Sequence, residues 1–265
     1  MASTNPARGM RDFLPADVRK RNYVIGIIKS VYESYGFEPL ETPAVENIET
    51  GFVKYIDEDN QVAEAETILA ATETLNRLGF KNFSIGLNHR QVLADILDTV
   101  GIPEIQHPEV LTLIENFISL DYSELSTALR ELEIPEKASE MLVEIFGHTQ
   151  EILSRESDIN RTIISNLINI VSNELLIELG QILRLSGDAP VVLDPSLARE
   201  FPFYTGSIIE INLPDHYSDS LGSGGRYDFS KEILDPVRKP ACRFEFEIDR
   251  LVSIMNEREM FSALR

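Results

Sequence analysis

Segments with strand character lie near both ends of this chain, and a long block of helical patterns separates them. The patterns predict short strands over residues 37–42, 83–87, 191–193, 207–213 and 241–249. From residue 103 to residue 187 the strand patterns vanish, and apolar residues recur at helical spacing. Strands from both ends must therefore form one sheet. The connections favour a mainly antiparallel sheet flanked by helices, which is an α+β fold with an all-helical insertion.

Periodic apolar residues also predict helices outside the helical block. One helix is expected over residues 15–35 and a second over residues 62–78, where Gly79 ends it. Asn88 is expected to cap a further helix that stops at Gly101.

Two domains follow from this arrangement. Residues 1–102 and 188–265 are expected to form the α+β core, and residues 103–187 the helical insertion domain. Within the insertion, residues 159–185 are apolar at helical spacing. A heptad zipper would explain this stretch, but burial in a small helical bundle explains it better.

The predicted strand over residues 241–249 alternates in a regular way, and a final helix is expected from Arg250. One face carries residues suited to a core, which are Cys242, Phe244, Phe246 and Ile248. The other face carries charged residues, which are Arg243, Glu245, Glu247 and Asp249. Such alternation predicts a strand with one buried face and one face in water.

The charge balance argues against nucleic-acid binding. The net charge is −20, from 24 basic and 44 acidic residues. Nucleic-acid binding depends largely on neutralisation of phosphates by Lys and Arg, and we find no dense basic stripe. The longest basic cluster, Arg19-Lys20-Arg21, is interpreted as a solvated helix face.

Cysteine and histidine usage argues against disulfides and metal sites. Cys242 is the one cysteine, which excludes an intramolecular disulfide, and the four histidines are scattered. We therefore expect no metal site. The sequence has no apolar run of membrane-spanning length and no signal-peptide pattern at its start, so we expect a cytoplasmic protein without a membrane partner.

Six segments, in order, together resemble histidyl-tRNA synthetase, a class II aminoacyl-tRNA synthetase. They are the N-terminal signature at 8–15, motif 1 at 35–43, the Asn-His-Arg triplet at 88–90, the first histidine motif at 199–206, the second at 224–228, and motif 3 at 240–250. The resemblance implies a sheet of the class II synthetase type and places the family's insertion domain at residues 103–187. It also implies a dimer through the motif 1 region around Pro43, although a monomer is equally compatible.

The resemblance carries over roles for five residues. Arg199 and Arg250 match arginines of the catalytic site, Arg250 being the one that the family uses on the γ-phosphate of ATP. Tyr204, Arg226 and Tyr227 match the histidine-binding pocket. The family activity would be ligation of histidine to tRNA, with ATP and Mg²⁺.

The main departure from the family concerns motif 2, a hairpin whose arginine grips the α-phosphate of ATP. Only Gly51 to Gln61 fill the space that this hairpin should occupy, and no arginine lies between Arg21 and Arg77. A loop this short cannot hold the hairpin with its flanking strands. The cation that stabilises the reacting phosphate is therefore expected to be missing.

Other departures alter the remaining pocket. Lys54 replaces a glutamine that helps to hold the substrate amino group, which puts a cation near a cation. Arg243 and Glu247 replace glycines of the adenosine floor, and Asp249 replaces a glutamate. In the first histidine motif Glu200 and Pro202 replace a glycine and an aspartate, and Glu200 is expected to pair with Arg199.

These departures predict a reduced, catalytically inactive scaffold of synthetase ancestry. A pocket floor converted into an exterior surface suggests deliberate redesign of a synthetase core. A natural paralogue that lost catalysis would explain the same departures. We expect no catalytic residue intact, no bound cofactor, no tRNA binding and no anticodon-binding domain. Two alternatives remain, a histidine-sensing regulatory subunit and a residual histidine-activating ligase.

Overall fold

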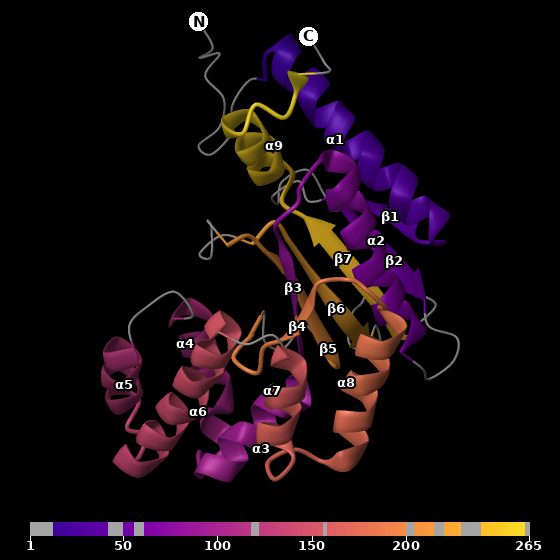
Figure 1. Ribbon diagram of the computed structural model, residues 1–265. Helices are drawn as coiled ribbons and strands as arrows, with labels where there is room; N and C mark the ends of the chain where they lie inside the picture. Colours follow the sequence, from indigo (N-terminus) through magenta and orange to yellow (C-terminus); the bar gives the residue numbers. More distant parts are fainter. Residues whose placement is uncertain are drawn as a thin grey trace, which may run out of the picture.

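Strands from both ends of the chain form one sheet in the computed structural model (Figure 1). The structure describes residues 13–41, 50–55, 61–117, 122–155, 158–199, 204–214, 220–228 and 240–262. Its strands are β1 (Glu38–Glu41), β2 (Thr50–Tyr55), β3 (Ser84–His89), β4 (Val191–Leu193), β5 (Ser207–Asn212), β6 (Gly222–Asp228) and β7 (Pro240–Phe246). Their order in the sheet is β1-β2-β7-β6-β5-β3-β4.

The sheet is mainly antiparallel, as predicted. Only β3 and β4 run parallel among the strand pairs that the structure describes. Strand β2 lies between β1 and β7, so part of the segment between Gly51 and Gln61 continues the sheet. The α+β class is therefore confirmed.

The helices gather in two parts of the molecule in Figure 1, and α3 lies with the insertion helices rather than with α1, α2 and α9. Those outside the insertion in the sequence are α1 (Pro15–Ser34), α2 (Val62–Leu78), α3 (Arg90–Val100) and α9 (Ile248–Glu257). Those within it are α4 (His107–Phe117), α5 (Tyr122–Glu131), α6 (Glu136–Arg155), α7 (Ile159–Leu167) and α8 (Asn173–Leu185), preceded by a short 3₁₀ helix η1 (Glu104–Gln106). In this part of the chain the structure describes no strand before β4, which agrees with the helical patterns.

Glycine ends two of the helices where the sequence predicts it. Gly79 after α2 and Gly101 after α3 both have left-handed backbone angles, with φ of 94° and 87°. This conformation is easy for glycine because it has no Cβ. The cap of α3 differs from the prediction, because His89 is the N-cap and its Nδ1 accepts a hydrogen bond from the Gln91 amide.

Asn88 does not cap α3 because it belongs to β3 and is buried. Its side-chain Nδ2 donates to the carbonyl oxygens of Leu197, at 2.9 Å, and Pro195, at 3.2 Å. Asn88 thus holds the loop after β4 against the end of β3.

The apolar stretch over residues 159–185 forms two helices rather than one. Helix α7 ends at Leu167, and Ser172 caps α8 by accepting a hydrogen bond from the Leu175 amide. The apolar residues Ile163, Leu167, Leu175, Leu179 and Ile182 are buried. The bundle interpretation therefore holds, and a continuous zipper does not form.

The core face of β7 is confirmed, because Cys242, Phe244, Phe246 and Ile248 are all buried. Tyr32 of α1 stacks on Phe244 and meets Phe246 edge-on, with ring centroids 6.1 Å and 5.6 Å apart. The strand is shorter than predicted, since it ends at Phe246 and α9 already begins at Ile248.

One continuous cluster of buried apolar side chains runs from α1 through the sheet into the helical insertion. The division into a core and an insertion domain therefore stays a prediction. Among the described helices, none is both long and apolar enough to cross a membrane.

Candidate functional site

The two faces of the sheet carry different polar residues. Helices α1 and α2 pack against one face, which we call the helix face. Side chains alternate between the two faces along a strand. Every second residue of a strand therefore points toward α1 and α2, and the residues in between point to the other side, which we call the opposite face. The predicted site residues divide between these two faces.

On the helix face, three residues of neighbouring strands lie in one row. Lys54 of β2 and Arg226 of β6 are both in register with Cys242 of β7. Each meets the first turns of α2. Arg226 Nε donates to Glu64 Oε1, the Thr67 hydroxyl donates to Cys242 Sγ at 3.2 Å, and Lys54 pairs with Glu66. The row therefore attaches α2 to the sheet through charge pairs.

The pair of Arg226 and Glu64 is deeply buried. The Glu64 side chain is fully buried and that of Arg226 is 13% exposed. Within the described part of the chain, the second oxygen of Glu64, Oε2, has no hydrogen-bond partner. A buried carboxylate is stable only when a cation compensates its lost hydration, and here Arg226 supplies that cation.

Cys242 lies between these charges. Burial, together with the negative charge of Glu64, raises the pKa of its thiol to about 12. A thiol with such a pKa is a poor nucleophile near neutral pH, because the thiolate is the reactive form.

Lys54 shares the helix face with Arg226, whereas Tyr227 of the predicted pocket lies on the opposite face. Besides pairing with Glu66, its Nζ donates to the Tyr35 carbonyl oxygen at 2.7 Å, at the end of α1. The Glu66 carboxylate therefore compensates the positive charge of Lys54 on the helix face.

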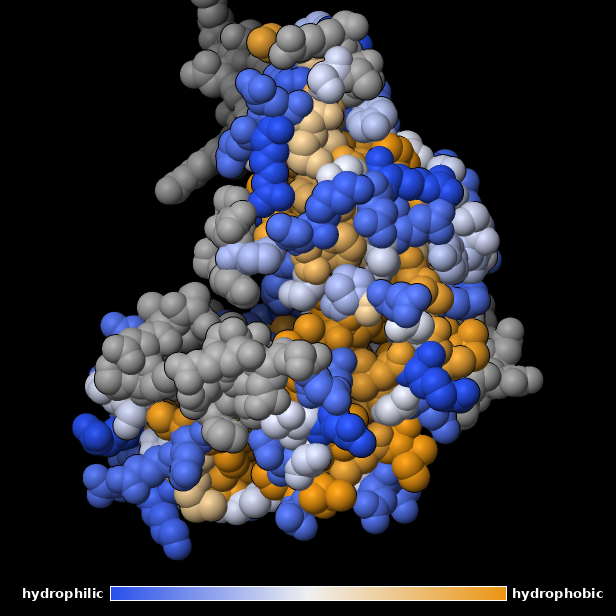
Figure 2. All heavy atoms as spheres, viewed as in Figure 1, coloured by the Kyte–Doolittle hydropathy of each residue, from blue (hydrophilic) through white to orange (hydrophobic). Residues whose placement is uncertain are grey.

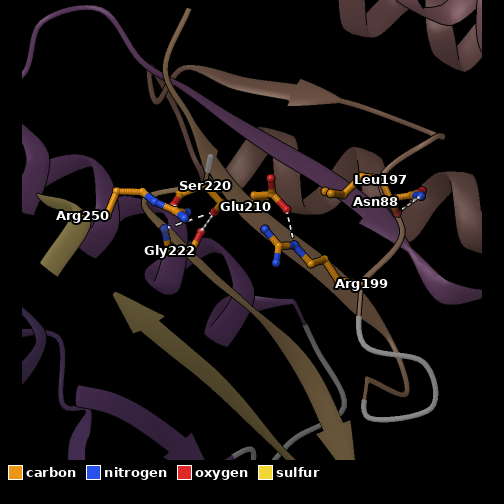
Figure 3. Close-up of polar contacts among 7 residues, drawn as sticks. All are labelled: Asn88, Leu197, Arg199, Glu210, Ser220, Gly222 and Arg250. Carbon is orange, nitrogen blue, oxygen red and sulfur yellow. Dashed lines mark hydrogen bonds and ion pairs between the residues drawn. The ribbon is translucent and has the colours of Figure 1, made fainter. Parts of the chain in front are cut away.

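The opposite face carries a second set of charge pairs. Arg243 and Glu245 of β7 lie two residues apart on this face and form an ion pair. Arg199 Nε donates to Glu210 Oε2 of β5 at 2.5 Å (Figure 3). Ser223 of β6 lies between Glu245 and Glu210 in the sheet register. Two arginines and two carboxylates thus face the same side of the central strands.

The exterior surface that the sequence predicted is found only in part. Glu247 and Asp249 are exposed, but they lie beyond β7, at the start of α9. The side chains of Arg243 and Glu245 are only 16% and 20% exposed. The Arg243 Nε and Glu245 Oε1 atoms are inaccessible to solvent. For these two residues the prediction is wrong, because alternation reveals which residues share a face, whereas neighbouring segments decide whether that face meets water.

Arg199 is held by a carboxylate from the sheet. Its predicted partner, Glu200, lies outside the described residues. Burial acts to lower the pKa of the Arg199 guanidinium, but the hydrogen bond and charge of Glu210 outweigh it and raise the pKa. The Arg199 charge is therefore permanent and already compensated inside the protein.

The tyrosines retained from the histidine motifs are both buried. Tyr204 is 7% exposed, and Tyr227, in register with Ala241 on the opposite face, is 2% exposed. Arg90 Nη1 donates to the Tyr204 carbonyl oxygen at 3.2 Å. The cavity lined by Arg90, Arg199 and Tyr204, among others, has a volume of about 10 Å³. That is about the space of one water molecule.

Arg250, in the first turn of α9, is tied to the chain before β6. Its Nη1 donates to the Ser220 carbonyl oxygen at 2.7 Å (Figure 3). The Ser220 hydroxyl in turn donates to the Gly222 carbonyl oxygen, at 2.8 Å, at the start of β6. Arg250 thus has a structural contact in addition to the nucleotide role that the resemblance implies.

The structure does not bring all five predicted site residues together. Arg199, Tyr204 and Tyr227 share the opposite face, whereas Arg226 points to the helix face and α2. Pro43, at the predicted dimer contact, lies outside the described residues. No group of three or more His, Cys, Asp or Glu in the described ranges could hold a metal ion.

Sequence reasoning missed two residues that shape these faces. Glu210 stands alone among the isoleucines of β5, and Glu64 stands between two alanines of α2. An isolated carboxylate in an apolar context signals a buried pair. At His89, which belongs to the Asn-His-Arg triplet, burial, helped by the charge of Arg226, lowers the pKa of the imidazole to about 4. Its imidazole is therefore neutral at pH 7.

Comparison with known proteins agrees with the resemblance. The family profile described as Histidyl-tRNA synthetase matches residues 53–251. The histidine–tRNA ligase of Gloeobacter violaceus is 25% identical over 361 aligned positions, which cover 97% of this chain and 76% of the relative. Because this chain has only 265 residues, the relative carries residues within the aligned region that this chain lacks.

Solved structures share the fold. The histidyl-tRNA synthetase from Nostoc sp. PCC 7120 matches with a TM-score of 0.77 and 17% identity, over 98% of this chain and 77% of that chain. A Bacillus halodurans protein described as an ATP phosphoribosyltransferase regulatory subunit/histidyl-tRNA synthetase matches with a TM-score of 0.73 and 16% identity, over 96% and 83% of the two chains. With the family profile spanning most of the sequence, the chain belongs to the histidyl-tRNA synthetase family.

Proposed function

We propose that this chain is a non-catalytic member of its family, a folded scaffold that does not activate histidine. The observation that carries the proposal is the ion pair of Arg243 and Glu245 on the opposite face of the sheet. The family resemblance places the adenosine floor along this strand, where glycines would leave room for the nucleotide. Here Arg243, which replaces one of those glycines, forms an ion pair with Glu245 on the same face, whereas Glu247 lies beyond the strand, at the start of α9.

Electrostatics supports the same conclusion. Because Glu245 neutralises Arg243, the pair offers a triphosphate that approaches this face no net attraction. Arg199 is already bound to Glu210, so a substrate would have to displace that carboxylate. Hydrogen bonds to charged groups are worth roughly 1.5–3 kcal/mol each, and breaking one would weaken substrate binding by a comparable amount. ATP and Mg²⁺ therefore do not fit the described residues of this face.

The missing motif 2 is a further argument against catalysis. The short segment after β1 contains β2, which pairs directly with β7. Lys54 of β2 is the one basic residue between Lys29 and Arg77. Lys54 is engaged with Glu66 and Tyr35 on the helix face. Removal of one electrostatic contact to a developing charge typically costs about 10²–10³ in rate, so loss of several leaves little activity.

Two measurements test the proposal on the folded chain. The first is histidine-dependent exchange of pyrophosphate into ATP, with an active histidyl-tRNA synthetase as the positive control. The second is calorimetric titration of histidine, with and without ATP and Mg²⁺. We expect no exchange and no heat of binding. Exchange above background, or histidine binding that tightens with ATP, would establish the residual ligase instead.

A histidine-sensing regulatory subunit is the second candidate. The fold match to a protein described as a phosphoribosyltransferase regulatory subunit favours it, as does retention of Tyr204 and Tyr227. Histidine binding that ATP leaves unchanged would establish this candidate. The cavity of about 10 Å³ beside Tyr204 argues against it, because the pocket would have to open first.

Self-association and tRNA binding belong to the same proposal. We expect any dimer to form through the motif 1 region around Pro43, and we expect no tRNA binding from a chain of net charge −20. Light scattering after size exclusion measures the first, and a filter-binding titration with tRNA measures the second.

A further inference from the structure

The helical insertion carries an apolar groove between α6 and α7. Its walls are the apolar side chains Ile145, Ile163, Leu167, Ile170 and Pro195, and its volume is about 290 Å³. Exposed apolar surface continues next to it, because Ile168, just after α7, is 56% exposed. Figure 2 shows hydrophobic surface in this lower part of the molecule. None of the five predicted site residues lines the groove.

The groove lies beside a line of acidic residues. Glu136, Glu140 and Glu144 are exposed and follow each other at intervals of four along α6, which places them on one side of the helix. Glu144 also lines the groove. A ligand that enters the groove therefore meets apolar walls and, at one edge, negative charge.

We propose that this groove docks a basic amphipathic helix of a partner protein. The apolar side of such a helix would fill the groove, and its Lys or Arg residues would face Glu140 and Glu144. The negative charge favours this occupant over a second copy of the chain, whose net charge is −20, and over nucleic acid or an anionic membrane.

The test uses a fluorescent synthetic helix of about 14 residues, with leucine and lysine at helical spacing. Its binding to the full chain is followed by fluorescence anisotropy at several salt concentrations. We expect saturable binding that weakens as salt rises. A matched peptide with glutamate in place of lysine is expected not to bind.

Three variants locate the site. Glu144→Lys reverses a charge at the groove, and Asn166→Trp, at another exposed lining position, fills the groove with an aromatic ring. Each is expected to weaken binding by about tenfold, equal to roughly 1.4 kcal/mol. Glu257→Lys, on an exposed position of α9, makes the same change of net charge elsewhere and is expected to leave the affinity unchanged. Thermal melts verify that all variants are folded.

The outcomes separate the possibilities. Equal weakening by Glu144→Lys and Glu257→Lys would mean that the peptide responds to net charge alone, which would overturn the proposal. Absence of saturable binding would overturn it as well. Concentration-dependent dimerisation that Asn166→Trp abolishes would reassign the groove to self-association.

Discussion

The Arg226 guanidinium of β6 forms an ion pair with the Glu64 carboxylate of α2, 162 positions away in the sequence. The pair lies in the row that joins Lys54, Cys242 and Arg226 to the start of α2. It therefore fixes how α2 sits on the sheet. Because Glu64 is fully buried, its charge depends on Arg226 for compensation.

Replacement of Arg226 by Gln should destabilise the protein strongly. The buried Glu64 carboxylate would lose its cation, and breaking a buried pair in this way costs about 3–5 kcal/mol. Guanidinium chloride unfolding, followed by circular dichroism, measures the change. The double variant Glu64→Gln with Arg226→Gln should lose less than Arg226→Gln alone, because it leaves no uncompensated charge.

An exposed pair in α2 provides the control. Arg77 and Glu73 form an ion pair with side chains 49% and 34% exposed. Arg77→Gln should cost less than about 1 kcal/mol, because water screens and replaces such pairs. Equal losses for Arg77→Gln and Arg226→Gln would contradict a special role of the buried pair.

His89 should make the stability depend on pH. Its pKa is lowered from 6.5 to about 4 in the folded protein, so the unfolded chain binds a proton first as pH falls. The stability that neutral His89 contributes is fully present above pH 6.5. It is lost as the pH falls toward 4, by at most about 3 kcal/mol.

His89→Asn isolates this effect, since asparagine does not titrate and is also a favoured helix N-cap. The unfolding free energy of the unaltered protein minus that of the variant, measured from about pH 7.5 to pH 4, should decrease as the pH falls, by up to about 3 kcal/mol. A constant difference over this range would show that His89 does not contribute the dependence. Carboxylates titrate in both proteins, so their contribution cancels in the comparison.

The Cys242 thiol should resist modification in the folded protein. It is fully buried, and its pKa is raised to about 12 by burial and by the charge of Glu64. At about pH 8 we expect a disulfide reagent such as dithionitrobenzoate to react only as fast as the protein opens. The same reagent should react at once in concentrated guanidinium chloride. Rapid reaction of the native protein would contradict the packing of β7 against α2.

Much of the fold could be predicted because the signals are local. Helix α2 and its end at Gly79 follow from helical spacing and from a glycine with φ of 94°. The core face of β7 follows from a strict alternation. The boundary between β7 and α9 was harder, since Ile248 suits either element.

The site could be predicted only in part, because its arrangement depends on pairings between distant segments. Arg226 and Tyr227 are neighbours in the sequence but lie on opposite faces, and the register between β6 and β7 decides which of them meets α2. In the same way, nothing near Arg199 in the sequence identifies Glu210 as its partner. Alternation alone predicted an exposed Arg243, whereas tertiary packing left it only 16% exposed.

Glu259→Gly should stabilise the protein. Glu259 follows α9 with φ of 53°, in the left-handed region that costs a residue with a Cβ about 1–2 kcal/mol. Glycine removes this strain but adds about 0.5–1 kcal/mol of chain entropy to the unfolded state, so the net gain should be about 0.5–1 kcal/mol. Glu133→Gly, at φ of 59° after α5, should act in the same direction.

As a control, Glu140→Gly inside α6 should cost about 1 kcal/mol, because helical glycine is unfavourable. Calorimetric melting temperatures would give the order Glu259→Gly, unaltered chain, Glu140→Gly. A loss of stability in Glu259→Gly would mean that the Glu259 side chain contributes contacts worth more than the backbone strain.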